Sequence, residues 1–227
     1  MKFENLRNFL APHKTIPNTP WRAKNQWSLT PSRVAILWFG LAIFGLGDSF
    51  LVQANIGNAP WTVFAQGISN KADISLGWST FLVSVAVLLM WIPLREKPGF
   101  GTLSNIVFIA AFIQVGITYI PLQKFIPSQL AFVFIGIALV GVGSALYITC
   151  GLGSGPRDGT MTGLHRRTGV RVSRVRLAIE VTVLLIGWLL GGNVGIGTLL
   201  FAILIGESIA ISLGIVARLT SRQMRFY

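Results

Sequence analysis

The chain has 227 residues, of which 52% are hydrophobic and 11% charged, and its mean hydropathy is +0.67. So few charges cannot cover a soluble domain of this size, which indicates a protein that is solvated by the lipid bilayer. A net charge of +12 is also typical of proteins that bind nucleic acid. Here the basic residues lie between apolar runs rather than along one face, so no nucleic-acid partner is expected.

Residues 1–33 are polar, contain prolines and carry six Lys/Arg. They have no early apolar core, so no cleavable signal peptide is expected, and the first membrane helix would itself direct insertion. Apolar residues at roughly helical spacing fit a short helix on the membrane surface. A partly disordered basic tail is the alternative, and the sequence leaves both open. The apolar residues are Phe3, Leu6, Phe9 and Leu10.

Six apolar spans follow, each close to the roughly 20 residues that cross a bilayer core of about 30 Å. Helices are the only plausible spanning structure at that length, so we expect an all-α integral membrane protein with six transmembrane helices. The spans are 34–53, 76–94, 102–120, 131–149, 172–190 and 197–217.

The basic residues predict the orientation of these spans. With the N-terminus in the cytoplasm, seventeen Lys/Arg lie inside: six in the tail, two at 95–101, six at 150–176 and three at the C-terminus. Only Lys71 and Lys124 lie outside. The positive-inside rule therefore predicts that both termini are cytoplasmic and supports a count of six.

The chain matches itself without a gap when it is shifted by 96 residues: Gly57 and Pro60 fall on Gly153 and Pro156. Aligned glycines and prolines mark backbone requirements, so we interpret the match as a duplication. The predicted units are a tail (1–33), a three-helix repeat (34–120), a linker (121–129), a second repeat (130–217) and a C-terminal tail (218–227). Three spans per unit make the repeats inverted in the membrane.

Two breaks, at 54–75 and 150–171, hold the polar motifs Asn-Ile-Gly-Asn-Ala-Pro-Trp (55–61) and Gly-Leu-Gly-Ser-Gly-Pro-Arg-Asp-Gly (151–159). Glycine and then proline before a short stretch is a helix-start pattern. One interpretation is a re-entrant half-helix from each side, whose N-termini would flank a transport site. The alternative is an ordinary amphipathic helix on each membrane face.

A solute held between the two breaks would contact a defined set of residues. Arg157 could pair with an anionic group of the solute or, as a structural role, with Glu180 or Glu207. The outer motif has Trp61 and Thr62 where the inner motif has Arg157 and Asp158, so the inner half is the more polar. The candidate substrate-binding residues are Gly57, Asn58, Trp61, Gly153, Gly155, Arg157 and Asp158.

Three acids lie within the spans, where a charge costs several kcal/mol and should face the protein interior. Glu180 lies four residues after Arg176, the spacing of a helical ion pair. Glu207 has no basic neighbour one turn away, which makes it the strongest candidate for proton or ion coupling. Asp48 lies just before the first break. All three, Asp48, Glu180 and Glu207, are candidates for this coupling role.

Other polar and small residues point to helix packing. Asn105 and Gln114 in the third span are expected to form interhelical hydrogen bonds. Glycines seven residues apart in spans one and four predict that these two helices pack closely. These glycines are Gly40, Gly47, Gly136 and Gly143.

Catalytic and metal-binding patterns are absent from the sequence. The two histidines, His13 and His165, have no metal-ligand spacing, and the single cysteine, Cys150, has no base partner and excludes an intramolecular disulfide. We expect neither an enzyme nor a cofactor.

The second break and its surroundings resemble the bacterial YczE/YitT-type multipass membrane proteins. The resemblance lies in the 151–159 motif, in Leu-His-Arg-Arg-Thr-Gly at 164–169 and in Gly-Gly-Asn-Val-Gly-Ile-Gly-Thr at 191–198, and it covers nearly all of 34–217. The chain stops soon after the last span, which is similar to the YczE type. The resemblance implies a bacterial cytoplasmic-membrane protein and supplies no substrate.

Three classes of function fit these features. A small-solute transporter comes first, because paired breaks in inverted repeats and acids at membrane depth are typical of transport sites. A channel-like pore is the second, and a membrane scaffold or accessory protein the third. The expected partners are the lipid bilayer, a small molecule or ion and a second copy of the chain.

Overall fold

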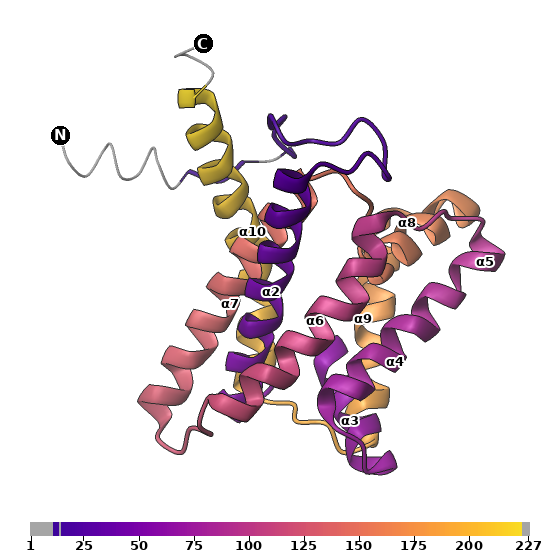
Figure 1. Cartoon of the computed structure of the whole chain (residues 1–227). Helices are drawn as coiled ribbons and strands as arrows, with labels where there is room; N and C mark the ends of the chain where they lie inside the picture. The colour runs from indigo at the N-terminus through magenta and orange to yellow at the C-terminus, as the bar shows by residue number, and fades with distance from the viewer. Residues whose placement is uncertain (1–10, 14, 224–227) are drawn as a thin grey trace.

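The computed structural model describes residues 11–13 and 15–223, which form nine helices and no strand (Figure 1). The surface helix predicted around Phe3 and Leu10 lies outside the described residues. The helices are α2 (Pro31–Ala54), α3 (Pro60–Ala72), α4 (Leu76–Leu89), α5 (Trp91–Leu94), α6 (Phe100–Tyr119), α7 (Ile126–Thr149), α8 (Pro156–Thr168), α9 (Val172–Leu189) and α10 (Ile196–Gln223).

Five stretches of the described chain are helical, long and apolar enough to cross a membrane. They are α2, α4 continued through α5, α6, α7 and the part of α10 from Ile196 to Thr220. The remaining predicted span, 172–190, does form a helix, α9, but Arg174, Arg176 and Glu180 make it more polar than the others. The prediction of an all-helical membrane protein is therefore confirmed.

Residues 15–30 form turns that lie across the ends of α6 and α7. The Thr19 hydroxyl donates to Thr149 O (3.1 Å), and Ala23 N donates to Cys150 O (2.8 Å). Phe100 N, at the start of α6, donates to Gln26 O (3.2 Å). This part of the predicted tail is therefore held by hydrogen bonds to the helices.

The backbone repeats itself at the predicted shift of 96 residues. Helices α3 and α8 start at residues 60 and 156, α4 and α9 at 76 and 172, and α6 and α10 at 100 and 196. All positive-φ residues in the described chain also form pairs at this shift. The pairs are Asn55 with Gly151, Gly57 with Gly153, Asp73 with Gly169, and Arg95 with Gly191.

Each half of the chain holds the break of the other half. Gly101 N, in the first turn of α6, donates to Leu152 O (2.7 Å) in the second break. Gly197 N, in the first turn of α10, donates to Ile56 O (2.8 Å) in the first break. Donors and acceptors again differ by 96 positions, so the two halves interlock and do not form separate bodies.

Helices α2 and α7 cross at the centre through the four predicted glycines. A methyl group added to Gly47 would lie 2.9 Å from Gly136 O, and one added to Gly143 would lie 2.6 Å from Gly40 O. Both distances are shorter than van der Waals contact, so only glycine allows the helices this close. The predicted packing of the first and fourth spans is confirmed.

The two halves differ in the packing of α4 and α9. Helix α4 packs along α6, where Gly77 N donates to the Gln114 side chain (Oε1, 3.0 Å). This confirms the interhelical hydrogen bond predicted for Gln114. In the described chain α9, the counterpart of α4, makes no comparable packing with α10.

Candidate functional site

A cavity of about 280 Å³ lies where the first turns of α3 and α8 meet. Helices α2, α6, α7, α9 and α10 complete its walls. Figure 1 shows α3 at the lower end of the molecule and α8 at the upper end. Two short helices from opposite ends therefore begin at one central site.

Two thirds of the described lining residues form pairs that are 96 positions apart. These seven pairs are Phe44 with Val140, Asp48 with Ser144, Ala59 with Gly155, Pro60 with Pro156, Trp61 with Arg157, Asn105 with Phe201, and Ile109 with Ile205. The other seven come from the second half alone: Tyr147, Ile148, Asp158, Met161, Arg176, Glu180 and Ile209. The cavity is thus lined by corresponding residues of both halves and extends toward α8 and α9.

The first turns of α3 and α8 present backbone N–H groups to this cavity. Each helix has proline at its start, and neither N-cap residue, Ala59 or Gly155, has a side chain that caps the helix. The first N–H groups of a helix have no partner within it and carry the positive end of the helix dipole. Both helix ends therefore favour negative charge in the cavity.

Arg157 is the central charged residue of the cavity. Its guanidinium lies over the Trp61 ring, with Cζ 5.1 Å from the ring centroid. Among the described residues no carboxylate lies within ion-pair distance of it. The pairing with Glu180 or Glu207 that the sequence allowed is therefore not formed. Asp48, Asp158 and Glu180 act on Arg157 only through longer-range electrostatics.

Asp48 faces Arg157 from α2. The residue is 1% exposed, and its Oδ2 atom has no hydrogen-bond partner in the described part of the chain. Arg157 is the positive charge that acts on it. Asp48 is therefore a buried carboxylate beside a half-buried cation with which it forms no ion pair.

The other acids of the cavity already have partners. Asp158 Oδ2 accepts a hydrogen bond from the Tyr147 hydroxyl (3.0 Å). Glu180 Oε1 accepts one from Arg176 Nε (2.9 Å), which confirms the predicted helical pair. Asp48 is thus the lining carboxylate with an oxygen atom, Oδ2, that is buried without a hydrogen-bond partner among the described residues.

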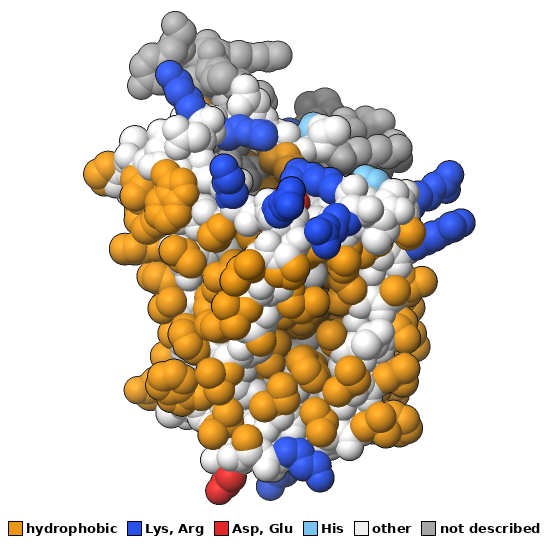
Figure 2. Space-filling view, turned by 90° about the vertical axis from the view of Figure 1, so that its right-hand side faces the viewer, with side chains coloured by type: hydrophobic (Ala, Val, Ile, Leu, Met, Phe, Trp, Pro, Cys, Tyr) orange, Lys and Arg blue, Asp and Glu red, His pale blue; other side chains and the backbone are white. Residues whose placement is uncertain are grey.

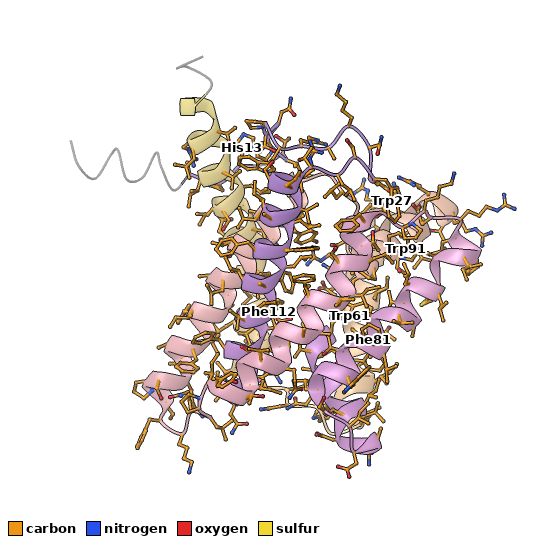
Figure 3. The ribbon with its side chains drawn as sticks, viewed as in Figure 1. His13, Trp27, Trp61, Phe81, Trp91 and Phe112 are labelled. Carbon is orange, nitrogen blue, oxygen red and sulfur yellow. The ribbon has the colours of Figure 1, made fainter. Side chains whose placement is uncertain are left out.

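Trp91 fixes the start of α8. Its indole N–H donates to Pro156 O (2.9 Å) and to the Thr160 hydroxyl (3.1 Å), and the residue is 3% exposed. Figure 3 shows Trp91 nearer the upper end of the molecule than Trp61. The side chain of Trp91 thus determines where the first turn of α8, and with it Arg157, is held.

The structure separates the predicted site residues into two groups. Trp61, Gly155, Arg157 and Asp158 line the cavity, together with two of the coupling candidates, Asp48 and Glu180. Gly57, Asn58 and Gly153 do not line it and instead hold the breaks. A methyl group on Gly57 would lie 2.4 Å from Gly195 N, one on Gly153 would lie 2.8 Å from Thr102 Oγ1, and Asn58 Nδ2 donates to Gln66 (2.8 Å).

Glu207 does not face the protein interior, and that expectation is wrong. It is exposed and absent from the cavity lining. Helix α10 reaches the cavity through Phe201, Ile205 and Ile209, which are one turn apart, and a residue two positions from Ile205 points to another side of the helix.

Sequence reasoning missed Tyr147 and Ser144 and assigned Asn105 only to helix packing. All three line the cavity. The 96-residue shift places Ser144 opposite Asp48 and was the signal that could have identified it. Tyr147 has Leu51 as its counterpart, so the repeat carries no such signal for it.

A second cavity, of about 680 Å³, lies between α3, α4, α8 and α9. Its wall is almost entirely apolar, and Trp61 separates it from the first cavity. Its lining includes no charged residue, so we place the chemistry in the first cavity.

The comparisons with known proteins agree with this membrane architecture. The model of a family of unknown function, DUF6198, matches residues 31–213. An uncharacterized protein of Haemophilus influenzae is 44% identical over 91% of this chain and 94% of its own length. The uncharacterized membrane protein YczE of Bacillus subtilis is 32% identical over 77% of this chain and 82% of its own length.

A third relative, the uncharacterized protein YyaS of Bacillus subtilis, is 26% identical over 79% of this chain. No solved structure matches the chain. The match covers all nine described helices except the last turns of α10, and it includes both breaks and the cavity. The chain is a membrane protein that belongs to the DUF6198 family and is of the YczE type.

Proposed function

We propose that the protein transports a small anionic solute, which binds in the cavity between α3 and α8. The observation that carries this proposal is the state of Arg157, which lines the cavity without a carboxylate at ion-pair distance in the described chain. An arginine at membrane depth is costly unless a counter-charge accompanies it. A solute carboxylate or phosphate supplies that charge and also accepts from the uncapped N–H groups of both helices.

The architecture that fits this function is a pair of inverted three-helix repeats with six spans. Its support is the 96-residue correspondence of helix starts, positive-φ positions and cavity residues. In this arrangement α3 and α8 are re-entrant half-helices, and α9 is the fifth span in chain order, which brings the number of spans to six. The charges that make α9 polar include Arg176 and Glu180, which line the cavity.

We assign the basic end of the molecule to the cytoplasmic side of a bacterial inner membrane. Figure 2 shows Lys and Arg gathered at the upper end, with a broad band of hydrophobic side chains below them. The positive-inside rule places such an end in the cytoplasm, together with both termini. The cavity extends toward α8 and α9, so this conformation opens inward.

Asp48 gives the site a means of proton coupling. Ionised Asp48 partly neutralises Arg157 and repels an incoming anion, whereas protonated Asp48 leaves the Arg157 charge to the solute. The lining therefore favours entry of the anion together with a proton. The other titratable groups at the cavity are Tyr147 on α7, Asp158 on α8, and Arg176 and Glu180 on α9.

A carrier fits the cavity better than an open pore. The lining residues without a counterpart all lie in the second half, and on the other side α4 packs along α6. A site that opens to one side at a time is the arrangement that a carrier needs and that a continuous pore lacks.

The test is a thermal-unfolding screen of the purified full-length protein against small carboxylates and phosphates at pH 5.5 and 7.5. At least one anion should raise Tm, and Arg157→Gln should weaken its binding about ten- to hundredfold, because a hydrogen bond to a charged group contributes about 1.5–3 kcal/mol. Arg174→Gln is the matched control, since Arg174 is exposed and outside the cavity lining. Equal shifts in both variants would remove Arg157 from the site and overturn the proposal.

A further inference from the structure

We infer that three buried hydroxyls, Thr62, Thr80 and Ser84, form the outer half of the solute path, on the side opposite the basic end. They would line the cavity in a second conformation, in which the same small anion reaches Arg157 from outside. This inference rests on the proposed function and adds the route that its site requires.

The first observation is the position of the three hydroxyls in the repeat. Thr62, Thr80 and Ser84 lie 96 positions before Asp158, Arg176 and Glu180. Those three counterparts line the cavity now and belong to the set that only the second half supplies. The hydroxyls are therefore the polar members of the set that would line the cavity if the two halves exchanged conformations.

The second observation is that one of these hydroxyls lacks a partner. Thr80 is 2% exposed, and its Oγ1 atom has no hydrogen-bond partner in the described chain. Thr62 is 1% exposed and lies beside the Asp48 carboxylate. Leaving a buried hydroxyl unsatisfied costs about 1–3 kcal/mol. Contact of the same hydroxyl with water or solute in another conformation of the protein would explain why the chain keeps a group that is unsatisfied here.

The third observation is the difference in packing between the halves. Helix α4 lies along α6, whereas α9 does not lie along α10, so the cavity has space toward α9 and none toward α4. Transporters with inverted repeats alternate by rocking one part against another around a fixed site. In the second state α9 would close on α10, and α4 would leave α6 and uncover Thr80 and Ser84.

The hydrogen bond from Gly77 N to Gln114 is the contact that this movement breaks. The residues at the corresponding positions of the second half are Ser173 and Ala210, so that half has no equivalent side-chain acceptor. The outer side is therefore closed by a specific hydrogen bond, and its lining is neutral where the inner lining is charged. Neutral hydroxyls hydrate an anion but hold it weakly, which suits entry and release.

The experiment measures cysteine labelling from each side of the membrane in a Cys150→Ala background. Thr80→Cys is treated in right-side-out and inside-out vesicles with a membrane-impermeant, anionic methanethiosulfonate. Labelling from the outer side should be several-fold faster than for Ser79→Cys. Ser79 is on the same helix, is 0% exposed and donates to Ala65 O, and its counterpart Val175 does not line the cavity. Arg176→Cys should be labelled from the inner side.

A second variant strengthens the test. Gln114→Leu removes the acceptor of Gly77 N and should speed the outer labelling of Thr80→Cys further. If Thr80→Cys does not fold, Ser84→Cys replaces it. Outer labelling of folded Thr80→Cys and Ser84→Cys no faster than that of Ser79→Cys would overturn the inference, even where an anion still raises Tm. Labelling without any anion effect would instead overturn the proposed function and retain the outer path.

Discussion

The guanidinium of Arg157 lies over the ring of Trp61, 5.1 Å from its centroid, and the two residues are 96 positions apart. Each is the counterpart of the other in the repeat, so one position of the repeat contacts its own counterpart at the centre of the molecule. Two arginines there would repel each other, and two tryptophans would leave no charge. The difference between the halves at this one pair creates a cation held on an aromatic face.

Replacing Trp61 tests that contact. A cation–π interaction contributes about 0.5–2 kcal/mol, so Trp61→Leu should weaken anion binding about two- to thirtyfold, whereas Trp61→Tyr should stay close to wild type. The measurement is an anion titration followed by thermal unfolding. Trp188→Leu, at an exposed position of α9, is the control and should leave affinity unchanged. Equal affinity in Trp61→Leu and Trp61→Tyr would show that the ring does not position Arg157.

Asp48 should make anion binding dependent on pH. Protonation removes the carboxylate charge that competes for Arg157, so wild type should bind more tightly as pH falls from 8 to 5. Asp48→Asn mimics the protonated form and should bind at pH 8 as wild type does at pH 5. Asp73→Asn, outside the cavity, should keep the wild-type profile. A pH dependence that persists in Asp48→Asn would assign coupling to another group.

The glycine crossing of α2 and α7 should not accept a side chain. A Cβ on Gly143 would lie 2.6 Å from both Gly40 O and Phe44 N, so these backbones must separate. Overpacking costs about 1–3 kcal/mol in well-packed cores, and Gly143→Leu should lower Tm by several degrees or prevent folding. Gly206→Leu is the control, because a Cβ on Gly206 has no atom within 4 Å. A similar Tm for both variants would contradict the crossing.

The repeat made much of the fold predictable. Gly57 and Gly153 align because the same turn, at φ +112° and +116°, precedes each short helix. The 96-residue shift holds for the starts of α3 and α8, of α4 and α9, and of α6 and α10, whereas α2 and α7 start 95 residues apart. The predictable features are those of the backbone, which both halves share. A glycine or proline keeps its role wherever that backbone recurs.

The cavity was less predictable, because its lining depends on the way the halves pack. Sequence alone could not show which side of α10 carries Glu207, and the structure shows that this residue is exposed. Tyr147 lines the cavity only because the second half is the open one, while its counterpart Leu51 is fully buried. A duplication reveals which positions correspond, but it does not reveal which of two corresponding positions faces the open side.

Cys150 should be unreactive in the folded protein. It is 0% exposed at the end of α7, and burial raises the pKa of its thiol to about 12. Because the thiolate is the nucleophile, the raised pKa lowers the reactive fraction at every pH below it. Native protein at pH 7.5 should therefore take up almost no maleimide over minutes, and protein unfolded in SDS should be labelled fully, as mass spectrometry can measure. Rapid labelling of native protein would show that residues 15–30 open away from α7, since Ala23 N bonds Cys150 O in this segment.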